Sequence, residues 1–264
     1  MNQNGIALIG FGAIGRTLAG LIAAEPGLRP TGVLVRGGSI PDARRLLPEG
    51  VRVVGDLDGL LATGAGLVVE CAGQEAVLTH AGPVLAAGVP LMVISTGALA
   101  TPGLLDRLTA VGKAPLIVPA GAIAGLDGLG TLKRAGLHAV TYTSTKPPLA
   151  WRGTPAERIL DLEGLRERTT FFEGNARDAA LHYPKNANLA ATVALAGLGF
   201  ERTRVRLVAD PDATGNLGEI EASSEIGTLS VTMAGRASAN PKTSASVAYS
   251  LLHAILSRGA GLVI

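Results

Sequence analysis

The sequence has 264 residues, 47% of them hydrophobic and 17% charged, which excludes a disordered chain and leaves enough length for one large domain or two small ones. A net charge of +2 with 3% aromatic residues argues against a nucleic-acid partner, and one cysteine with four scattered histidines predicts neither an intrachain disulfide nor a metal site. No signal-peptide pattern or membrane-length apolar run is present, so we expect a cytoplasmic protein with no membrane partner.

The first predicted elements are a buried strand over residues 6–9 and a helix over residues 17–24. Between them, residues 10–15 follow the pattern G-x-G-x-x-G, which in this context is typical of dinucleotide binding. Gly10 permits the tight turn, Gly12 lets the backbone approach a pyrophosphate, and Gly15 allows the helix to pack closely on the strand. The backbone N–H groups of Ala13 and Ile14 open the helix and face the anion. The alternative is a glycine-rich turn of an unrelated α/β protein.

A second strand over residues 30–36 ends at Arg36, where an acidic side chain would favour NAD by holding the adenosine ribose. Arginine instead suits a 2′-phosphate, with which it forms two parallel hydrogen bonds. We therefore predict NAD or NADP as cofactor, with NADP accepted. A solvated arginine at the end of a strand is the alternative.

The pattern continues with strands at residues 51–54, 66–73, 90–99 (with its loop) and 115–118, and with helices at 56–62, 76–85 and 102–111. Regular alternation of this kind predicts a Rossmann-type doubly wound parallel sheet. Cofactors bind at the carboxyl ends of such strands, which places Ala72 and Gly73 near the nicotinamide ribose. We expect Cys71 to be a small buried hydrophobe and His80 to face solvent.

After residue 120 strands and helices no longer alternate. Strands are predicted at residues 138–145 and 204–209, helices at 175–181 and 186–197, an exposed excursion at 152–168, and a hairpin at 219–233. This predicts a smaller α+β substrate domain with a mixed or antiparallel sheet, one face of it open. We expect residues 1–120 to form the dinucleotide-binding domain and residues 121–240 to form the substrate, catalytic and dimerisation domain. The final helix (244–256, within 241–264) returns to the first domain.

These motifs together resemble the L-aspartate dehydrogenase family over essentially the full chain. The residues that carry the resemblance lie at 10–15, 70–73, 95–99, 121–127, 146–148, 183–191 and 240–244. The resemblance implies NAD(P)-dependent oxidative deamination of L-aspartate through iminosuccinate to oxaloacetate and ammonia, or the reverse reductive amination. It also implies that Ala122 and Asn188 contact the cofactor, that the substrate is a small amino or oxo acid, and that the protein is a homodimer.

One position departs from the family pattern. Where the family has its catalytic histidine, in an Asn-x-His-Glu-Ile run, this sequence has Gly218. Glycine cannot move a proton, and a positioned base typically contributes about 10²–10⁴-fold to the rate. Three explanations stand: an engineered substitution, a divergence toward imine reduction, or transfer of the role to another group such as His182 or Lys185. His138 and His253 have structural interpretations.

Substrate carboxylates need cationic or amide partners. Lys146, Lys185 and Lys242 each lie beside a proline in a matched motif and are the candidates, with a solvated lysine as the alternative for each. Two other functions stay open because of Gly218. One is an imine reductase or dehydrogenase for a related amino acid, and the other is a cofactor-binding homologue without catalysis.

Overall fold

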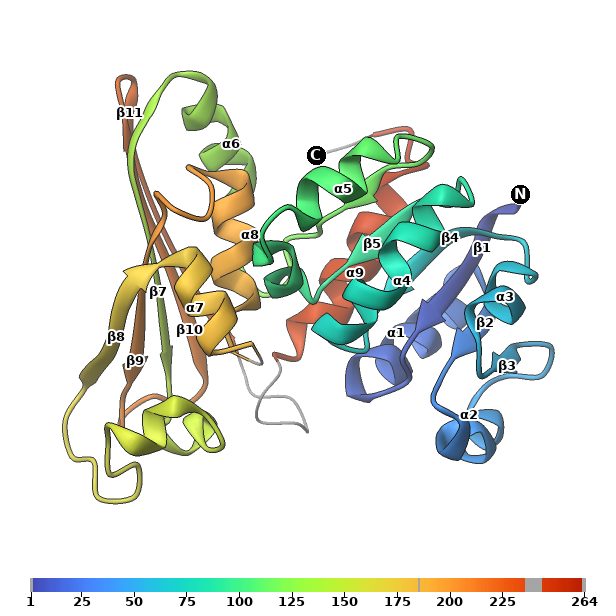
Figure 1. Cartoon of the computed structure of the whole chain (residues 1–264), viewed down its shortest axis with the longest axis horizontal. Helices are drawn as coiled ribbons and strands as arrows, with labels where there is room; N and C mark the ends of the chain where they lie inside the picture. Colours follow the sequence, from blue (N-terminus) through green and yellow to red (C-terminus); the bar gives the residue numbers. More distant parts are fainter. Residues whose placement is uncertain (1, 185, 236–243, 263–264) are drawn as a thin grey trace. The chain divides into compact units, whose positions relative to one another are not determined.

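The apolar runs of the N-terminal half form a six-stranded sheet in a computed structural model that describes residues 2–184, 186–235 and 244–262 (Figure 1). All pairings in this sheet are parallel, and the strand order is β3-β2-β1-β4-β5-β6. This order is that of a doubly wound dinucleotide-binding sheet, as predicted. The strands are β1 (Asn2–Ile9), β2 (Arg29–Leu34), β3 (Arg52–Val54), β4 (Ala65–Glu70), β5 (Leu91–Val93) and β6 (Leu116–Ile117).

Helices connect and cover these strands, because a parallel sheet needs crossover connections and buries both of its faces. Strand β4 illustrates this, since all six of its residues are buried. The helices are α1 (Ala13–Ala24), α2 (Ile40–Leu46), α3 (Leu57–Leu61), α4 (Gln74–Ala86), α5 (Leu104–Ala110) and α9 (Ser246–Ser257), with 3₁₀ turns at Gly37–Ser39 and Thr96–Ala100. None of the helices within the described residues is both long and apolar enough to cross a membrane.

Two of the boundaries that differ from the sequence prediction lie next to the predicted cofactor site. Helix α1 begins at Ala13 rather than at residue 17, because Gly12 is its N-cap and the glycine motif itself enters the helix. Strand β2 ends at Leu34, so Arg36 lies beyond the strand, in the turn that leads into the Gly37–Ser39 segment.

The second sheet has five strands in the order β11-β10-β7-β9-β8 and is mixed. Strand β10 runs antiparallel to both of its neighbours, whereas β7 and β9 are parallel. Its strands are β7 (Leu137–Lys146), β8 (Thr169–Asn175), β9 (Arg204–Ala209), β10 (Asn216–Ser224) and β11 (Gly227–Gly235). Its helices are α6 (Leu126–Arg134), α7 (Ala176–His182) and α8 (Asn188–Ala196), with 3₁₀ turns at Pro148–Trp151 and Pro155–Arg158.

The helices of this second sheet lie on one of its faces (Figure 1). Alternation along β10 agrees with this arrangement, because Gly218, Ile220 and Ala222 are buried while Glu219 and Glu221 are not. No described helix covers the opposite face, which carries polar and charged side chains. The expected open face is therefore present.

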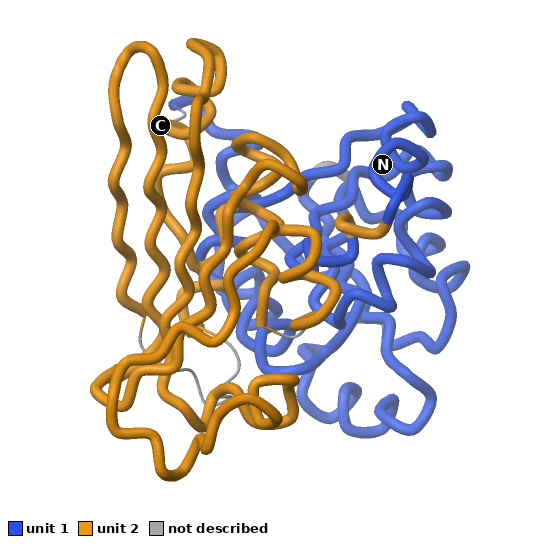
Figure 2. The backbone as a smooth tube through the Cα atoms, turned by 60° about the vertical axis from the view of Figure 1, so that its left-hand side comes forward, with its two compact units in different colours: residues 1–98, 102–119, 248–264 blue, residues 99–101, 120–247 orange. Residues whose placement is uncertain are grey.

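The chain divides into two compact units (Figure 2). Unit 1 comprises Met1–Ala98, Pro102–Pro119 and Ala248–Ile264, and unit 2 comprises Leu99–Thr101 and Ala120–Val247. Most of α9 thus belongs to unit 1, although the chain reaches it from unit 2. The short segment Leu99–Thr101 belongs to unit 2, within the stretch that the sequence analysis assigned to the first domain.

Candidate functional site

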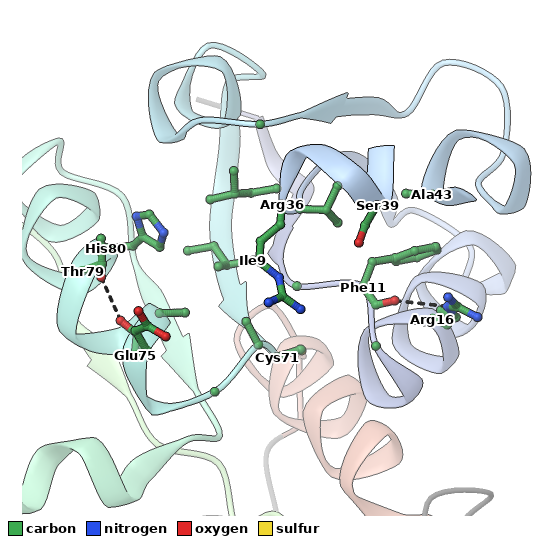
Figure 3. Close-up of a pocket in the computed structure, with 18 of the residues that line it drawn as sticks. Ile9, Phe11, Arg16, Arg36, Ser39, Ala43, Cys71, Glu75, Thr79 and His80 are labelled. Atoms are coloured by element: carbon green, nitrogen blue, oxygen red, sulfur yellow. Dashed lines mark hydrogen bonds between the residues drawn. The ribbon is translucent and has the colours of Figure 1, made fainter. Parts of the chain in front are cut away.

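Unit 1 contains a groove of about 730 Å³ at the carboxyl edge of its sheet (Figure 3). The parallel strands β1 and β4 are neighbours in the sheet. The chain continues from β1 toward β2 on one side and from β4 toward β5 on the other, so a crevice forms between the turns that follow β1 and β4. The predicted residues that line the groove are Gly10, Gly12, Arg36, Ala72 and Gly73. Of the other predicted residues of this unit, Ala13, Ile14 and Gly15 form the first turn of α1.

The glycines of the motif serve three different purposes. Gly10 has φ +96°, and a β-carbon there would stand 2.7 Å from the Cα atom of Ala72. A β-carbon on Gly15 would stand 2.5 Å from the carbonyl oxygen of Gly10, so only glycine permits this contact between helix and turn. Around Gly12, in contrast, nothing lies within 4 Å of such an atom. Its bare backbone is therefore open to a ligand, in the way a pyrophosphate requires.

Glu70, in one of the motifs that carry the family resemblance, supports two residues of the groove wall. It is 1% exposed and accepts four hydrogen bonds: from the backbone N–H groups of Ala72 and Gly73 (both 2.7 Å), from the Ser95 N–H (3.0 Å) and from the Ser95 hydroxyl (2.9 Å). Burial raises the pKa of this carboxyl, and the hydrogen bonds oppose that rise. The carboxylate thus holds the 72–73 turn against Gly10. This role could not be predicted from the sequence, because Ser95, one of the donors, lies 25 positions away along the chain.

The end of the groove next to β2 is polar. Figure 3 shows the guanidinium of Arg36 pointing into the groove, with Ser39 nearby. Asp42 also lines the groove, and its carboxylate forms an exposed ion pair with Arg45 at 2.9 Å. No sequence pattern marks Ser39 or Asp42, because their place in the groove depends on how α2 folds back.

Phe11 and Arg16 form another side of the groove (Figure 3). The Arg16 guanidinium lies 5.7 Å from the centre of the Phe11 ring, and its Nε donates a hydrogen bond to the Phe11 carbonyl oxygen at 3.1 Å. This pairing orders the exposed turn between the first two glycines and adds a positive charge where a pyrophosphate would lie.

The structure corrects the expectation for His80. It does not face solvent but is half-buried and lines the groove from α4 (Figure 3), and burial lowers its pKa. Cys71 also lies on the groove wall and is half-buried rather than fully buried. Burial, with the Glu70 charge, raises the pKa of its thiol, so it stays protonated and is not a nucleophile.

In unit 2, Gly218 is the third residue of β10, directly opposite Ser144 of β7. A β-carbon on Gly218 would stand 2.9 Å from the Cδ1 atom of Ile123 and 3.5 Å from the hydroxyl oxygen of Tyr142. Ile123 belongs to the loop that also holds Ala122, and this loop contacts the start of α8, where a β-carbon on Gly121 would lie 3.4 Å from Leu189. The loop that holds Ala122 therefore lies beside the start of α8, whose first residue is Asn188.

Lys146, the last residue of β7, is 7% exposed. Its Nζ lies 5.2 Å from the centre of the fully buried Trp151 ring, and among the described residues it has neither a hydrogen bond nor an ion pair. Burial lowers its pKa to about 8. Trp151 in turn contacts Tyr183 edge to face, with ring centres 6.4 Å apart. This contact joins the motif that begins at Lys146 to the motif that begins at Tyr183.

Asn186 makes a second contact between the segment that contains Trp151 and the segment that contains Tyr183. Its Nδ2 donates to the Ala150 carbonyl oxygen at 3.3 Å, while its buried Oδ1 has no hydrogen-bond donor among the residues that the structure describes. The remaining candidates are placed less favourably or lie outside the described residues. His138, His182 and His253 are exposed, and the predicted Lys185 and Lys242 fall on residues that the structure does not describe. Within the described ranges no group of three or more metal-ligating side chains occurs.

A doubly wound sheet with a glycine turn in a groove beside β1 and β4, joined to an α+β unit, defines the class of nicotinamide-dependent oxidoreductases. Two family models match: "Homoserine dehydrogenase, NAD binding domain" at residues 10–115 and "Aspartate dehydrogenase, C-terminal" at residues 127–258. L-aspartate dehydrogenase of Cupriavidus necator is 44% identical over 260 residues, covering 96% of this chain and 97% of that protein. L-aspartate dehydrogenase of Pseudomonas aeruginosa is 44% identical over 255 residues, covering 95% and 96%. This chain belongs to the L-aspartate dehydrogenase family.

Solved structures agree with this assignment. The crystal structure of aspartate dehydrogenase from Thermotoga maritima matches with a TM-score of 0.76 at 26% identity and covers 98% of both chains. An amine dehydrogenase from Mycobacterium smegmatis matches with a TM-score of 0.58 at 13% identity, which shows a shared fold alone.

Proposed function

We propose that this protein catalyses the NAD(P)-dependent oxidative deamination of L-aspartate, through iminosuccinate, to oxaloacetate and ammonia, or the reverse reductive amination. The observation that carries the proposal is a groove suited to a dinucleotide in a chain that is 44% identical, over nearly its full length, to proteins named L-aspartate dehydrogenase. When bound, the cofactor accepts or returns a hydride at the substrate carbon that bears nitrogen.

The residues around the groove fit a dinucleotide. Gly10, Gly12, Ala13, Ile14 and Gly15 would hold the pyrophosphate with backbone N–H groups at the start of α1. The fit is supported by the two glycines whose β-carbons would collide with the turn and by the open space at Gly12. We propose that Ala72 and Gly73, held by Glu70, lie near the nicotinamide ribose. Ala122 and Asn188 are proposed cofactor contacts on the strength of the family resemblance.

The choice between NAD and NADP depends on Arg36. Its side chain is exposed, lines the groove and has no ion-pair partner among the described residues, so it is available to a 2′-phosphate. The neighbouring carboxylate of Asp42 is occupied by Arg45. We propose that NADP is accepted, with NAD as the other usable cofactor.

For the substrate, we propose that the motif lysines Lys146, Lys185 and Lys242 serve the two carboxylates and the reacting nitrogen. The support for Lys146 is its position: a buried amine beside the Trp151 ring, without a counter-ion among the described residues. Buried cations are normally paired, so a lysine left without a partner is suited to an anionic ligand or to carrying a proton.

The decisive experiment measures absorbance at 340 nm with aspartate and either oxidised cofactor, and with oxaloacetate, ammonia and either reduced cofactor. Turnover with these pairs alone supports the proposal. No change with any of them, while calorimetry detects tight cofactor binding, would remove it.

One observation favours a second candidate function. Position 218 has no side chain, and the space beside it is filled by Ile123 and Tyr142. An imine reductase or dehydrogenase acting on a related amino acid, or a non-catalytic cofactor-binding protein, would not need a histidine there. A panel of amino acids and preformed imines separates these alternatives: preference for an imine favours the reductase, and no turnover with tight cofactor binding favours the non-catalytic protein.

The homodimer and the cytoplasmic location are proposals that rest on the family resemblance and on the sequence. Sedimentation equilibrium tests the first, since a monomer at micromolar concentration would contradict it. Fractionation of cells that express the protein tests the second.

A further inference from the structure

The helix-covered face of the second sheet gathers a small set of groups at one place. In a strand, alternate side chains lie on the same face, so Tyr142, Ser144 and Lys146 of β7 share a face. Gly218 pairs directly with Ser144 and therefore lies on this face too. Ser144 is two residues before Lys146 on β7. The opposite face is marked by Thr145 and Glu219, both of which contact Arg168.

Lys146 is the group on this face that is equipped to exchange a proton. Its Nζ is beside the Trp151 ring and lacks any carboxylate or carbonyl partner among the described residues. Asp210 is tied to Lys146 through the backbone, because its N–H donates to the Lys146 carbonyl oxygen, but its carboxylate pairs with Arg168, whose Nη1 is 4.0 Å away. Within the described part of the chain, no counter-ion therefore holds the Lys146 amine in its charged form.

The other titratable groups near this face are less suitable. Burial raises the pKa of Tyr142 far above its ordinary value, and burial also raises that of Tyr183, so both hydroxyls keep their protons. His182 is exposed at the C-terminal end of α7. Ser144 does not titrate in the working range.

We propose that Lys146 is the acid–base group that activates water for hydrolysis of the imine intermediate; this rests on the proposed deamination. The neutral Nζ takes a proton from water as the water oxygen bonds to the carbon of the protonated imine and the C=N π pair moves to nitrogen. The resulting ammonium returns that proton to the nitrogen of the carbinolamine. The C–N bond then breaks, the carbonyl forms, and ammonia leaves with the hydroxyl proton as ammonium. The hydrolysis changes no oxidation state, because the substrate has already lost its hydride when the imine forms.

The acidity of Lys146 agrees with this assignment, because an amine with a pKa of about 8 has an appreciable neutral fraction near neutral pH. The base must be neutral at the start of the step. Steady-state turnover is therefore expected to rise with pH through a value near 8 and to level off above it.

The experiment uses two variants. Lys146→Arg keeps the positive charge but does not give up its proton, and Lys146→Met removes the charge and the exchangeable proton at similar side-chain volume. Rapid mixing with aspartate and oxidised cofactor at about pH 9 separates the first turnover, which reports hydride transfer, from the steady state, which includes hydrolysis. We expect both variants to keep a burst of one reduced cofactor per site and to lose about 10²–10⁴-fold in the steady state. The inflection near pH 8 should vanish in both. Lys113→Met, at an exposed lysine of unit 1, is the control and should match the parent.

Two results would overturn the assignment. Full steady-state turnover in Lys146→Arg would mean that only the positive charge matters. Loss of the burst together with the steady state, in variants that still fold and bind cofactor, would mean that Lys146 binds substrate and does not carry the proton. Failure of the parent protein to reduce either oxidised cofactor with aspartate would instead refute the proposed function itself, and the two failures are thus distinguishable.

Discussion

The Cδ1 atom of Ile123 lies 2.9 Å from the point where a β-carbon on Gly218 would stand. Real β-carbons essentially never come so close to another heavy atom, so a side chain at 218 requires Ile123 to move. Ile123 is 3% exposed and its terminal methyl group is the atom in the way, which a rotamer change can displace. A glycine in the interior of a strand weakens it, and here it accompanies a close approach from a neighbouring loop.

Gly218→His should therefore destabilise the protein by about 1–3 kcal/mol through overpacking. Ile123→Val removes the colliding atom and alone should cost about 0.5–1.5 kcal/mol. The two changes made together should cost less than the sum of their separate effects, because the residues share one space. Chemical denaturation of the four proteins measures this coupling, and strict additivity would contradict the described contact.

The same histidine offers a test of catalysis. Introduced into Lys146→Met, Gly218→His would supply a base to the face that has lost one, and we expect steady-state deamination to recover by a hundredfold or more. In the parent background the gain should be below tenfold, because Lys146 already performs the step. A hundredfold gain in the parent background would contradict the role of Lys146.

Glu70→Gln should weaken cofactor binding by tenfold or more. Both carboxylate oxygens accept backbone N–H groups, so the amide NH₂ of glutamine must face a donor, and a buried donor without an acceptor costs about 1–3 kcal/mol. The 72–73 turn would then lose its position against Gly10. Calorimetric titration with each cofactor measures the effect. Ser95→Ala, which removes one of the four bonds, should cause only a few-fold loss, and Glu221→Gln on an exposed strand position should cause none.

Arg36→Ala should raise the KM for NADP by about 10–100-fold and leave the KM for NAD within about threefold. The reason is the loss of a charge-assisted, two-point contact with the 2′-phosphate, which NAD lacks. Arg29→Ala is a matched control, because this exposed arginine lies at the amino end of β2, whereas Arg36 follows the carboxyl end of that strand. An equal effect on both cofactors would show that Arg36 contacts some other part of the dinucleotide.

The buried amine of Lys146 should make stability depend on pH. Its pKa is about 8 in the folded chain and about 10.4 when unfolded, so between these values the unfolded chain binds more protons. The stability of the parent relative to Lys146→Met should therefore increase from pH 8 to pH 10.5, by up to about 3 kcal/mol. Thermal or chemical unfolding at several pH values provides the measurement. A constant difference between the two proteins across this range would show that the lysine is not desolvated.

Much of the fold follows from local patterns. The glycine motif between an apolar run and a helical run specifies a strand, a turn and a helix through backbone geometry alone, and β9 has the predicted bounds of Arg204–Ala209. The hairpin of β10 and β11 likewise follows from alternation around a glycine-containing turn. These features are readable because each depends on residues that are neighbours in the chain.

By itself, the sequence determined the class of sheet, the dinucleotide turn and the family to which the chain belongs. The tertiary structure alone decided the four hydrogen bonds of Glu70, the position of His80 in the groove, the contact between Ile123 and Gly218, and the desolvation of Lys146. Burial and acidity are set by atoms from segments far apart in the chain, which meet only when the sheets and helices have packed. A lysine at the end of a strand is solvated or buried according to what folds over it, and here Trp151 does so.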